Sequence, residues 1–396
     1  MAKIKKIKQA VILAGGMGLR LRPLTYDRPK LVVHVNNRPF LDYLLELLKK
    51  NGVSEVIVLL GYLPEKITEY LGDGSKFGIK VKYSIGAIDD GTGTRVKNAK
   101  DLLDDTFLLL YCDNYLRLDL QELLRFHNEK EALVTMTVYT NKYGFTKNNV
   151  FVDGGYVNKY DRSRKDPGLN GVDLGFFIMN KKALDLIPQE NSYIDEKLIP
   201  ALIAEGSLAG YMTDQLYYSL STPERLKITE KFLRPRKVIF LDRDGVINKK
   251  MPSGDYVRNW GEFEFLPGAI EAMRVLTENG YEIYVISNQA GIGRGLMTEG
   301  DLFEIHKSME AEIAKRGAKI AAIYYCPHGW NDGCLCRKPK PGMLFRAAID
   351  HQIDLPNTIF VGDDERDGEA GRAAGCRTIL LKENDSLLSA VRSIIS

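Results

Sequence analysis

Three cysteines and one histidine gather near the C-terminal end of a chain that has only five cysteines. The residues of this group are Cys326, His328, Cys334 and Cys336. Thiolates and imidazole nitrogens are ligands that Zn²⁺ prefers, and four of them complete a closed, tetrahedral structural site. The alternatives are buried free cysteines or a redox pair, although no Cys-x-x-Cys precedes a helix here. The spacing predicts a zinc loop, directly before the basic run 337–340.

In the C-terminal part of the chain, polar side chains follow directly after three predicted apolar strands. Asp242 and Asp244 follow KVIFL, Ser287 follows YEIYVI, and Asp363 follows TIFVG. Because ligands of open α/β sheets bind at the carboxyl ends of the strands, we expect these side chains to converge. Carboxylates from two strands are suitable ligands for Mg²⁺.

This set of residues could carry out phosphoryl transfer. A carboxylate such as Asp242 can attack phosphorus and form an aspartyl phosphate. Asp244 is placed to protonate the leaving oxygen and later to activate water. Ser287 and Lys338 supply a hydroxyl donor and a cation for the charge of the transferred group. The simplest alternative is that Asp-x-Asp-Gly forms an acidic turn without a catalytic role.

Four motifs in chain order, LDRDGV, ISNQ, RKPKPG and VGDD, resemble those of the haloacid dehalogenase-like phosphatases. The resemblance implies that Asp242 is the nucleophile and Asp244 the general acid and base. It also implies that Ser287 and Lys338 hold the phosphoryl group. The implied Mg²⁺ ligands are Asp242, the backbone carbonyl of Asp244, and Asp363.

The zinc loop and the run SNQAGIGRG make the resemblance more specific, because they point to one group within these phosphatases. Residues 236–396 are similar to D-glycero-D-manno-heptose 1,7-bisphosphate phosphatases, a group close to the histidinol phosphatases. By this resemblance the substrate-binding residues are Asn288, Arg294 and Arg337. A nucleic-acid-binding zinc module is a further alternative for the Cys/His group, but the net charge of +3 gives it little support.

A second candidate site lies near the N-terminus. AVILA reads as a buried strand, and Gly15, Gly16 and Gly18 follow it directly. Glycines at this place let backbone N–H groups approach phosphate oxygens. Arg20 and Lys30 add positive charge. The pattern predicts a nucleotide-binding loop.

The full run GGMGLRLRPLTYDRPK resembles the sugar-1-phosphate nucleotidyltransferases, over about residues 9–231. The resemblance implies that Asp113, in LLYCDNY, binds a metal ion, and that the DGTGT loop with Gly91 lies near the base and the sugar. The sequence departs from the family pattern at Leu19, where threonine or serine is usual. It departs again at Ser219, where a second metal-binding aspartate is usual.

The elements that must position these residues alternate between strands and helices. Apolar runs such as VIVLL and FLLLY alternate with helical patterns such as FLDYLLELLKK. This alternation predicts α/β folds with parallel sheets covered on both faces. We expect two doubly wound domains: a Rossmann-like nucleotidyltransferase domain at 1–232, a linker at 233–236, and a haloacid dehalogenase-like phosphatase domain with a zinc loop and a minimal cap at 237–396.

The composition limits the location and the partners of the protein. The chain has 396 residues, of which 44% are hydrophobic. No apolar run approaches the roughly 18 residues of a membrane span, and the basic start lacks the apolar segment of a signal peptide. We expect a cytoplasmic protein with no membrane or nucleic-acid partner, and the oligomeric state stays open.

The phosphatase resemblance and the nucleotidyltransferase resemblance together imply two consecutive reactions. A phosphatase acting at position 7 of a heptose 1,7-bisphosphate produces a sugar 1-phosphate, which a nucleotidyltransferase consumes. We therefore expect a bifunctional enzyme that needs Mg²⁺ and Zn²⁺ and makes a nucleotide-activated heptose. The resemblance favours GTP and the α-anomer, giving GDP-D-glycero-α-D-manno-heptose, and the choice of base is an inference from pathway logic. The alternative is a phosphatase with a degenerate nucleotide- or sugar-binding N-terminal domain.

Overall fold

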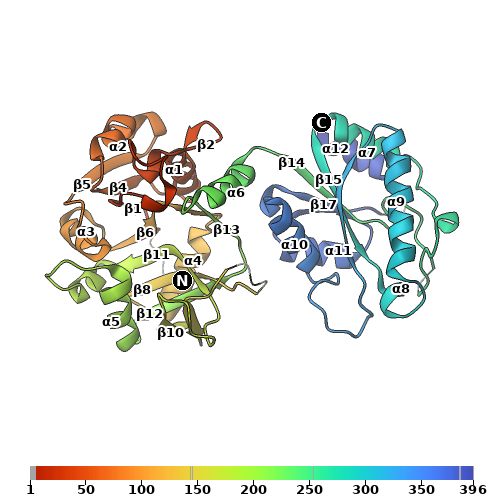
Figure 1. Ribbon diagram of the computed structural model, residues 1–396. Helices are drawn as coiled ribbons and strands as arrows, with labels where there is room; N and C mark the ends of the chain where they lie inside the picture. Colours follow the sequence, from red (N-terminus) through yellow and green to blue (C-terminus); the bar gives the residue numbers. More distant parts are fainter. Residues whose placement is uncertain (1–5, 143, 145, 253, 383–384, 396) are drawn as a thin grey trace. The chain divides into compact units, whose positions relative to one another are not determined.

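The computed structural model describes residues 6–142, 144, 146–252, 254–382 and 385–395 (Figure 1). The chain divides into two compact units, Met1–Leu233 and Arg234–Ser396. Each unit has its own sheet and its own buried apolar core. The predicted α/β class is confirmed for both units.

The N-terminal unit is built on a nine-stranded sheet. In sheet order its strands are β5 (Lys80–Ile85), β4 (Glu55–Leu60), β1 (Gln9–Ala14), β6 (Thr106–Tyr111), β11 (Val172–Asn180), β8 (Val134–Tyr139), β12 (Leu208–Thr213), β10 (Tyr156–Tyr160) and β9 (Val150–Asp153). Strands β5, β4, β1 and β6 are parallel, whereas β11 runs antiparallel to β6 and to β8. The expectation of a wholly parallel sheet is therefore wrong for β11 and β10, whereas β12 pairs in parallel with β8. After β8 the chain forms the β9–β10 hairpin and not the helical crossover that a parallel neighbour needs.

Helices cover both faces of this sheet, because alternate residues of a buried strand point to opposite sides. Ile12 of β1 belongs to one apolar cluster and Val11 to the other. The helices of the unit are α1 (Phe40–Lys50), α2 (Pro64–Leu71), α3 (Thr92–Asn98), α4 (Leu120–Lys130), α5 (Ile199–Ala204) and α6 (Pro223–Leu233). Two short ribbons, β2 (His34–Val35) with β3 (Arg38–Pro39) and β7 (Asn114–Leu116) with β13 (Tyr217–Ser219), complete it.

The C-terminal unit has a five-stranded sheet that is parallel throughout, as the sequence predicts. In sheet order its strands are β16 (Ile320–Cys326), β15 (Tyr281–Asn288), β14 (Lys237–Leu241), β17 (Ile359–Gly362) and β18 (Arg377–Leu380). Because β14 lies between β15 and β17, the three strands that end in polar residues are neighbours. Their carboxyl ends lie at one edge of the sheet.

Helices also lie on both faces of the second sheet (Figure 1). They are α7 (Ala269–Glu278), α8 (Ala290–Gly293), α9 (Glu299–Lys315), α10 (Gly342–His351), α11 (Glu365–Ala373) and α12 (Leu387–Ile395). Helices α7, α9 and α12 pack on the face that carries Ile239 and Leu241. Helix α11 packs on the other face, where Gly371 meets Phe360. Within the described parts of both units, no helix combines the length and the apolar character needed to cross a membrane.

Candidate functional site

The carboxyl end of β14 carries a buried carboxylate, Asp242. Its Oδ1 lies 2.8 Å from Nζ of Lys338, and the same ammonium lies 2.7 Å from Oδ1 of Asp367. Burial raises the pKa of Asp242, Asp367 adds to this effect, and the positive charge of Lys338 opposes it. Burial alone would lower the pKa of Lys338, but the two carboxylates raise it. A buried carboxylate beside a fixed cation is suited to attack on a phosphoryl group.

Three carboxylates at this edge could hold a metal ion. Asp242, Asp363 and Asp367 each offer an oxygen, and these oxygens lie within 4.8 Å of one another. Oδ1 of Asp363 is buried and accepts no hydrogen bond from the described residues. A buried acceptor without a donor, next to two further carboxylates, fits a hard cation such as Mg²⁺.

Asp367 is a member of this group that the sequence analysis missed. Its side chain is almost fully buried and accepts hydrogen bonds from the backbone N–H groups of Asp363 and Asp364. Helix α11 begins directly after Asp364, and Asp367 is its third residue. The available signal was the run VGDDERD, because a carboxylate in the first turn of a helix can return to the preceding strand end.

Both carboxylate oxygens of Asp244 accept hydrogen bonds. Oδ1 accepts from Arg243 at 2.9 Å and from Asn248 at 3.0 Å, and Oδ2 accepts from Gln289 at 2.9 Å and Ser287 at 3.4 Å. Burial would raise the pKa of Asp244, but the charge of Arg243 and these hydrogen bonds hold it below the usual value. Asp244 is therefore ionised at neutral pH and can accept a proton.

A pocket of about 410 Å³ is lined by Asp242, Asp244, Ser287, Lys338 and Asp367. Further residues of its wall are Lys250, Tyr256, Asn288, Trp330, Arg337 and Arg366. The side chain of Asn288 is occupied by the backbone of Lys338, with contacts of 3.0 and 3.1 Å. Arg294 is not a wall residue; it donates to the carbonyl of Gly254 and lies 4.5 Å from the ring of Trp330. The structure therefore brings Arg337 to the pocket, uses Asn288 to hold the Lys338 loop, and leaves Arg294 at the margin.

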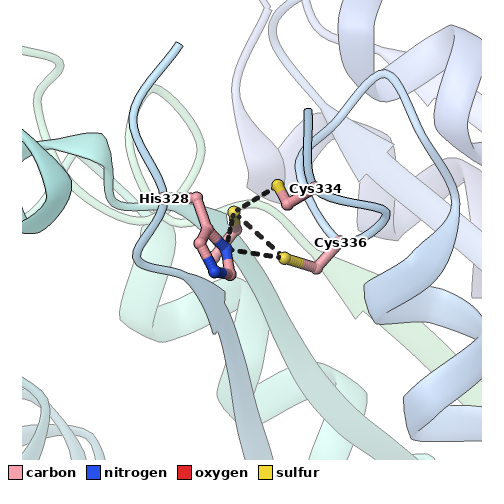
Figure 2. A group of neighbouring side chains, drawn as sticks. His328, Cys334 and Cys336 are labelled. Atoms are coloured by element: carbon pink, nitrogen blue, oxygen red, sulfur yellow. Dashed lines mark hydrogen bonds between the residues drawn. The ribbon is translucent and has the colours of Figure 1, made fainter. Parts of the chain in front are cut away.

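The structure brings all four predicted zinc ligands together. Figure 2 shows His328, Cys334 and Cys336 pointing toward one another. Sγ of Cys326 lies 3.5 Å from Nδ1 of His328, 3.6 Å from Sγ of Cys334 and 3.2 Å from Sγ of Cys336. Metal–ligand bonds of about 2.0–2.3 Å give tetrahedron edges near these lengths. Cys326 is the last residue of β16, so the group joins the loop that carries Lys338 to the sheet.

The glycine loop of the N-terminal unit lies between β1 and a short 3₁₀ helix at Leu19–Leu21. Nζ of Lys30 lies 2.8 Å from Oδ2 of Asp113, which follows β6, the parallel neighbour of β1. Arg20 is exposed, and Gly91 precedes helix α3. The glycine loop, Lys30 and Asp113 thus lie at the carboxyl ends of adjacent strands, where a nucleotide can bind.

Arg95 is a buried cation beneath this loop that the sequence analysis missed. Its guanidinium is surrounded by backbone carbonyls and donates to those of Leu60, Ala87, Ile88 and Asp90. A Cβ atom at Gly15 would lie 2.2 Å from Cζ of Arg95, whereas one at Gly16 would meet nothing within 4 Å. Arg95 therefore holds the loops after β1, β4 and β5 in place.

The two neighbouring glycines give a matched test of this packing. We expect Gly15→Ala to lower the free energy of unfolding of the N-terminal unit by about 1–3 kcal/mol, because a held guanidinium cannot yield. It should also weaken nucleotide binding. Gly16→Ala is the control for stability, measured by denaturant unfolding. Equal stability of the two variants would contradict the close contact between Gly15 and Arg95.

The position of Ser219 can also be described. Strand β13 pairs with β7, and the N–H of Leu220 donates to the carbonyl of Asp113 at 2.8 Å. Oγ of Ser219 lies 2.9 Å from Oγ of Ser221. The chain therefore places two hydroxyl groups near Asp113, where the family resemblance leads one to expect a second carboxylate.

Comparison with known proteins agrees with the division of the chain into two units. The family pattern described as nucleotidyl transferase matches residues 9–219, and one described as HAD-hydrolase-like matches residues 335–392. The D-glycero-beta-D-manno-heptose-1,7-bisphosphate 7-phosphatase of Pseudomonas aeruginosa is 42% identical over 147 residues, covering 37% of this chain and 82% of that protein. The D-glycero-alpha-D-manno-heptose-1,7-bisphosphate 7-phosphatase of Campylobacter jejuni is 44% identical over 147 residues, covering 37% of this chain and 81% of that protein.

A solved structure resembles the chain in fold alone. It is the crystal structure of a protein assigned as a glucose-1-phosphate thymidylyltransferase of Bacillus anthracis, with a TM-score of 0.51 and 16% identity. The likeness covers 57% of this chain and 95% of that one.

Together, the folds and the two sites define a bifunctional α/β enzyme, with a phosphatase part and a sugar-phosphate nucleotidyltransferase part. The chain belongs to the nucleotidyl transferase family and to the D-glycero-D-manno-heptose-1,7-bisphosphate 7-phosphatase family. The predicted fusion of these two families is confirmed.

Proposed function

We propose that the C-terminal unit hydrolyses the 7-phosphate of D-glycero-α-D-manno-heptose 1,7-bisphosphate, and that the N-terminal unit transfers GMP from GTP to the heptose 1-phosphate. The observation that carries the proposal is the arrangement of Asp242, Lys338 and Asp363 at one sheet edge, in a chain that also holds a glycine loop. Relatives of both anomeric specificities are more than 40% identical, so the anomer needs its own test. We place the activity in the cytoplasm, where nucleoside triphosphates are available.

The phosphatase reaction needs two steps. An oxygen of Asp242 attacks the phosphorus, and the bond from phosphorus to the sugar oxygen breaks. Asp244 is ionised in the free site, so it must take up a proton from solvent as the negatively charged phosphate binds, and it passes this proton to the leaving oxygen. Water then attacks the aspartyl phosphate and gives its proton to Asp244, which releases phosphate and restores Asp242. Ser287 and Lys338 donate to the phosphoryl oxygens during both steps.

Two metal sites support this chemistry. We propose that Asp242, Asp363 and the backbone carbonyl of Asp244 hold Mg²⁺, which when bound neutralises negative charge on the phosphoryl oxygens. Asp367 keeps the ammonium of Lys338 beside Asp242. The Cys/His group of residues 326–336 would hold a structural Zn²⁺ that fixes the loop before Lys338.

In the N-terminal unit an oxygen of the sugar 1-phosphate attacks the α-phosphorus of the nucleotide, and the bond to pyrophosphate breaks. Backbone N–H groups of residues 15–18 and the ammonium of Lys30 would stabilise the phosphate oxygens. Asp113 is the proposed metal ligand, which would require Lys30 to move from its present pairing with Asp113 toward the phosphates.

One incubation tests both activities. Purified protein and Mg²⁺ are mixed with each anomer of the heptose 1,7-bisphosphate and with GTP, ATP, CTP or UTP in turn. We expect phosphate, pyrophosphate and a GDP-heptose from the α-anomer, measured by mass spectrometry. Phosphate from the β-anomer alone would overturn the anomer assignment. A sugar nucleotide formed only with another base would overturn the choice of GTP.

The alternative is that the N-terminal unit is degenerate and has no transferase activity. The hydroxyl groups of Ser219 and Ser221 allow a specific test of this alternative. If this unit turns over with fewer carboxylates, Ser219→Asp should lower the Mg²⁺ concentration for half-maximal transfer by about tenfold, because an added carboxylate raises metal affinity. Ser221→Ala is the control. If nucleotide binds but neither the natural chain nor Ser219→Asp releases pyrophosphate with any sugar 1-phosphate, the alternative is correct.

A further inference from the structure

Arg243 is a fully buried arginine between Asp242 and Asp244. One Nη group donates to Oδ1 of Asp244 at 2.9 Å and to Oε1 of Gln289 at 3.3 Å. The other Nη group lies 3.3 Å from Nε2 of His306, on helix α9. The side chain does not line the substrate pocket. The guanidinium of Arg243 therefore contacts Asp244, the proposed general acid and base, without lining the pocket.

The directions of the hydrogen bonds around Arg243 follow from its chemistry. A guanidinium only donates, so Nε2 of His306 must accept. Burial and the charge of Arg243 lower the pKa of His306 to about 3, which is consistent with a neutral ring. His306 thus holds one end of the guanidinium, and Asp244 holds the other.

The same rule orients the amide of Gln289. Its oxygen must face Arg243, and its Nε2 then donates to Oδ2 of Asp244 at 2.9 Å and to Oγ of Ser287 at 2.7 Å. Because Oγ of Ser287 accepts from Gln289, its own hydrogen is directed to another acceptor. That acceptor is Oδ2 of Asp244 here, at 3.4 Å, and can be a phosphoryl oxygen when substrate is bound.

We propose that Arg243 is a positioning residue of the phosphatase site. It holds the carboxylate of Asp244 in place for proton transfer and, through Gln289, turns the hydroxyl group of Ser287 toward the substrate. The inference rests on the proposed role of Asp244 as general acid and base. Its first consequence is that loss of Arg243 impairs protonation of the leaving group more than attack on phosphorus.

Two substrates separate these effects. An alkyl phosphate, here the heptose bisphosphate, needs a proton on its leaving oxygen, whereas p-nitrophenyl phosphate has a leaving group that departs without one. We expect Arg243→Met to lower kcat for the alkyl phosphate by about 10²-fold more than for p-nitrophenyl phosphate, in the range of general acid catalysis. KM should change little for either substrate. Arg243→Lys, which keeps a donor, should restore part of the loss.

Three further variants complete the test. Asp244→Asn should show the same substrate selectivity and a larger loss. Gln289→Met should show it as well, and it replaces Arg243→Met if that protein does not fold. Arg274→Met, which removes only surface ion pairs with Glu271 and Glu278, is the control and should change neither rate.

The outcomes are distinguishable. Equal losses on both substrates for Arg243→Met and Gln289→Met, with selectivity retained by Asp244→Asn, would overturn the positioning role alone. Absence of selectivity in Asp244→Asn would overturn the proposed role of Asp244, and the inference with it. Selectivity in Arg243→Met, Gln289→Met and Asp244→Asn supports both roles.

Discussion

Replacement of Asp242 by asparagine is expected to abolish phosphate release, while nucleotidyl transfer to supplied heptose 1-phosphate continues. The amide has nearly the shape of the carboxylate but cannot form the acyl phosphate. Loss of a nucleophile that acts with partner groups costs about 10⁴-fold or more in kcat. Phosphate release from p-nitrophenyl phosphate is the direct measurement, and it does not depend on the identity of the natural substrate.

The stability of the same variant should not fall. Burial raises the pKa of Asp242, which means that the folded protein binds a proton there more readily than an exposed carboxyl does. A neutral side chain removes the cost of burying this charge, although Lys338 then keeps only Asp367 as a close carboxylate partner. We expect an unchanged or higher Tm. A loss of phosphatase activity that accompanies a lower Tm and a loss of nucleotidyl transfer would contradict the role of Asp242 as nucleophile.

Replacement of Cys326 by serine is the second large effect that we expect. Cys326 is buried and has contacts with three other members of the Cys/His group. Without its thiolate the site should lose zinc, and the chain before Lys338 should lose its fixed position. We expect bound zinc, measured by elemental analysis, to fall from about one ion per chain to none. Phosphatase activity should fall by about 10²-fold or more, because the cation beside Asp242 is displaced.

The chain supplies a matched control for this variant. Cys376 is also buried in the C-terminal unit, but it is not part of a possible metal group among the described residues. Cys376→Ser should keep both zinc and phosphatase activity. If the natural protein binds no zinc after purification in its presence, the structural zinc site is wrong. If Cys326→Ser loses zinc but keeps full activity, the link between the loop and Lys338 is wrong.

Two parts of the phosphatase unit could be recognised in the sequence because their residues lie close together in the chain. Asp242 and Asp244 are two residues apart, and the four possible zinc ligands lie within 326–336. Apolar runs that end in polar residues identify strand ends, and parallel strands bring these ends to one edge. The order of the strands, with β14 between β15 and β17, places these three strand ends next to one another.

The antiparallel part of the first sheet could not be predicted in this way. A buried strand has a similar apolar pattern whether its neighbour is parallel or antiparallel, as β11 illustrates. Direction depends on the connections, and the segment between β8 and β11 contains a hairpin in place of a helix.

By itself, the sequence determined the class of fold, the two families and the residues whose chemistry is local: the aspartates after β14, the Cys/His group and the glycine loop. Only the tertiary structure decided which distant polar groups meet them. Arg95 under the glycine loop, Asp367 beside Lys338, and His306 behind Arg243 are examples. The physical reason is that a buried charge is stable only beside polar or charged partners. Those partners lie on other elements, and their separation along the sequence follows no fixed spacing that a motif could show.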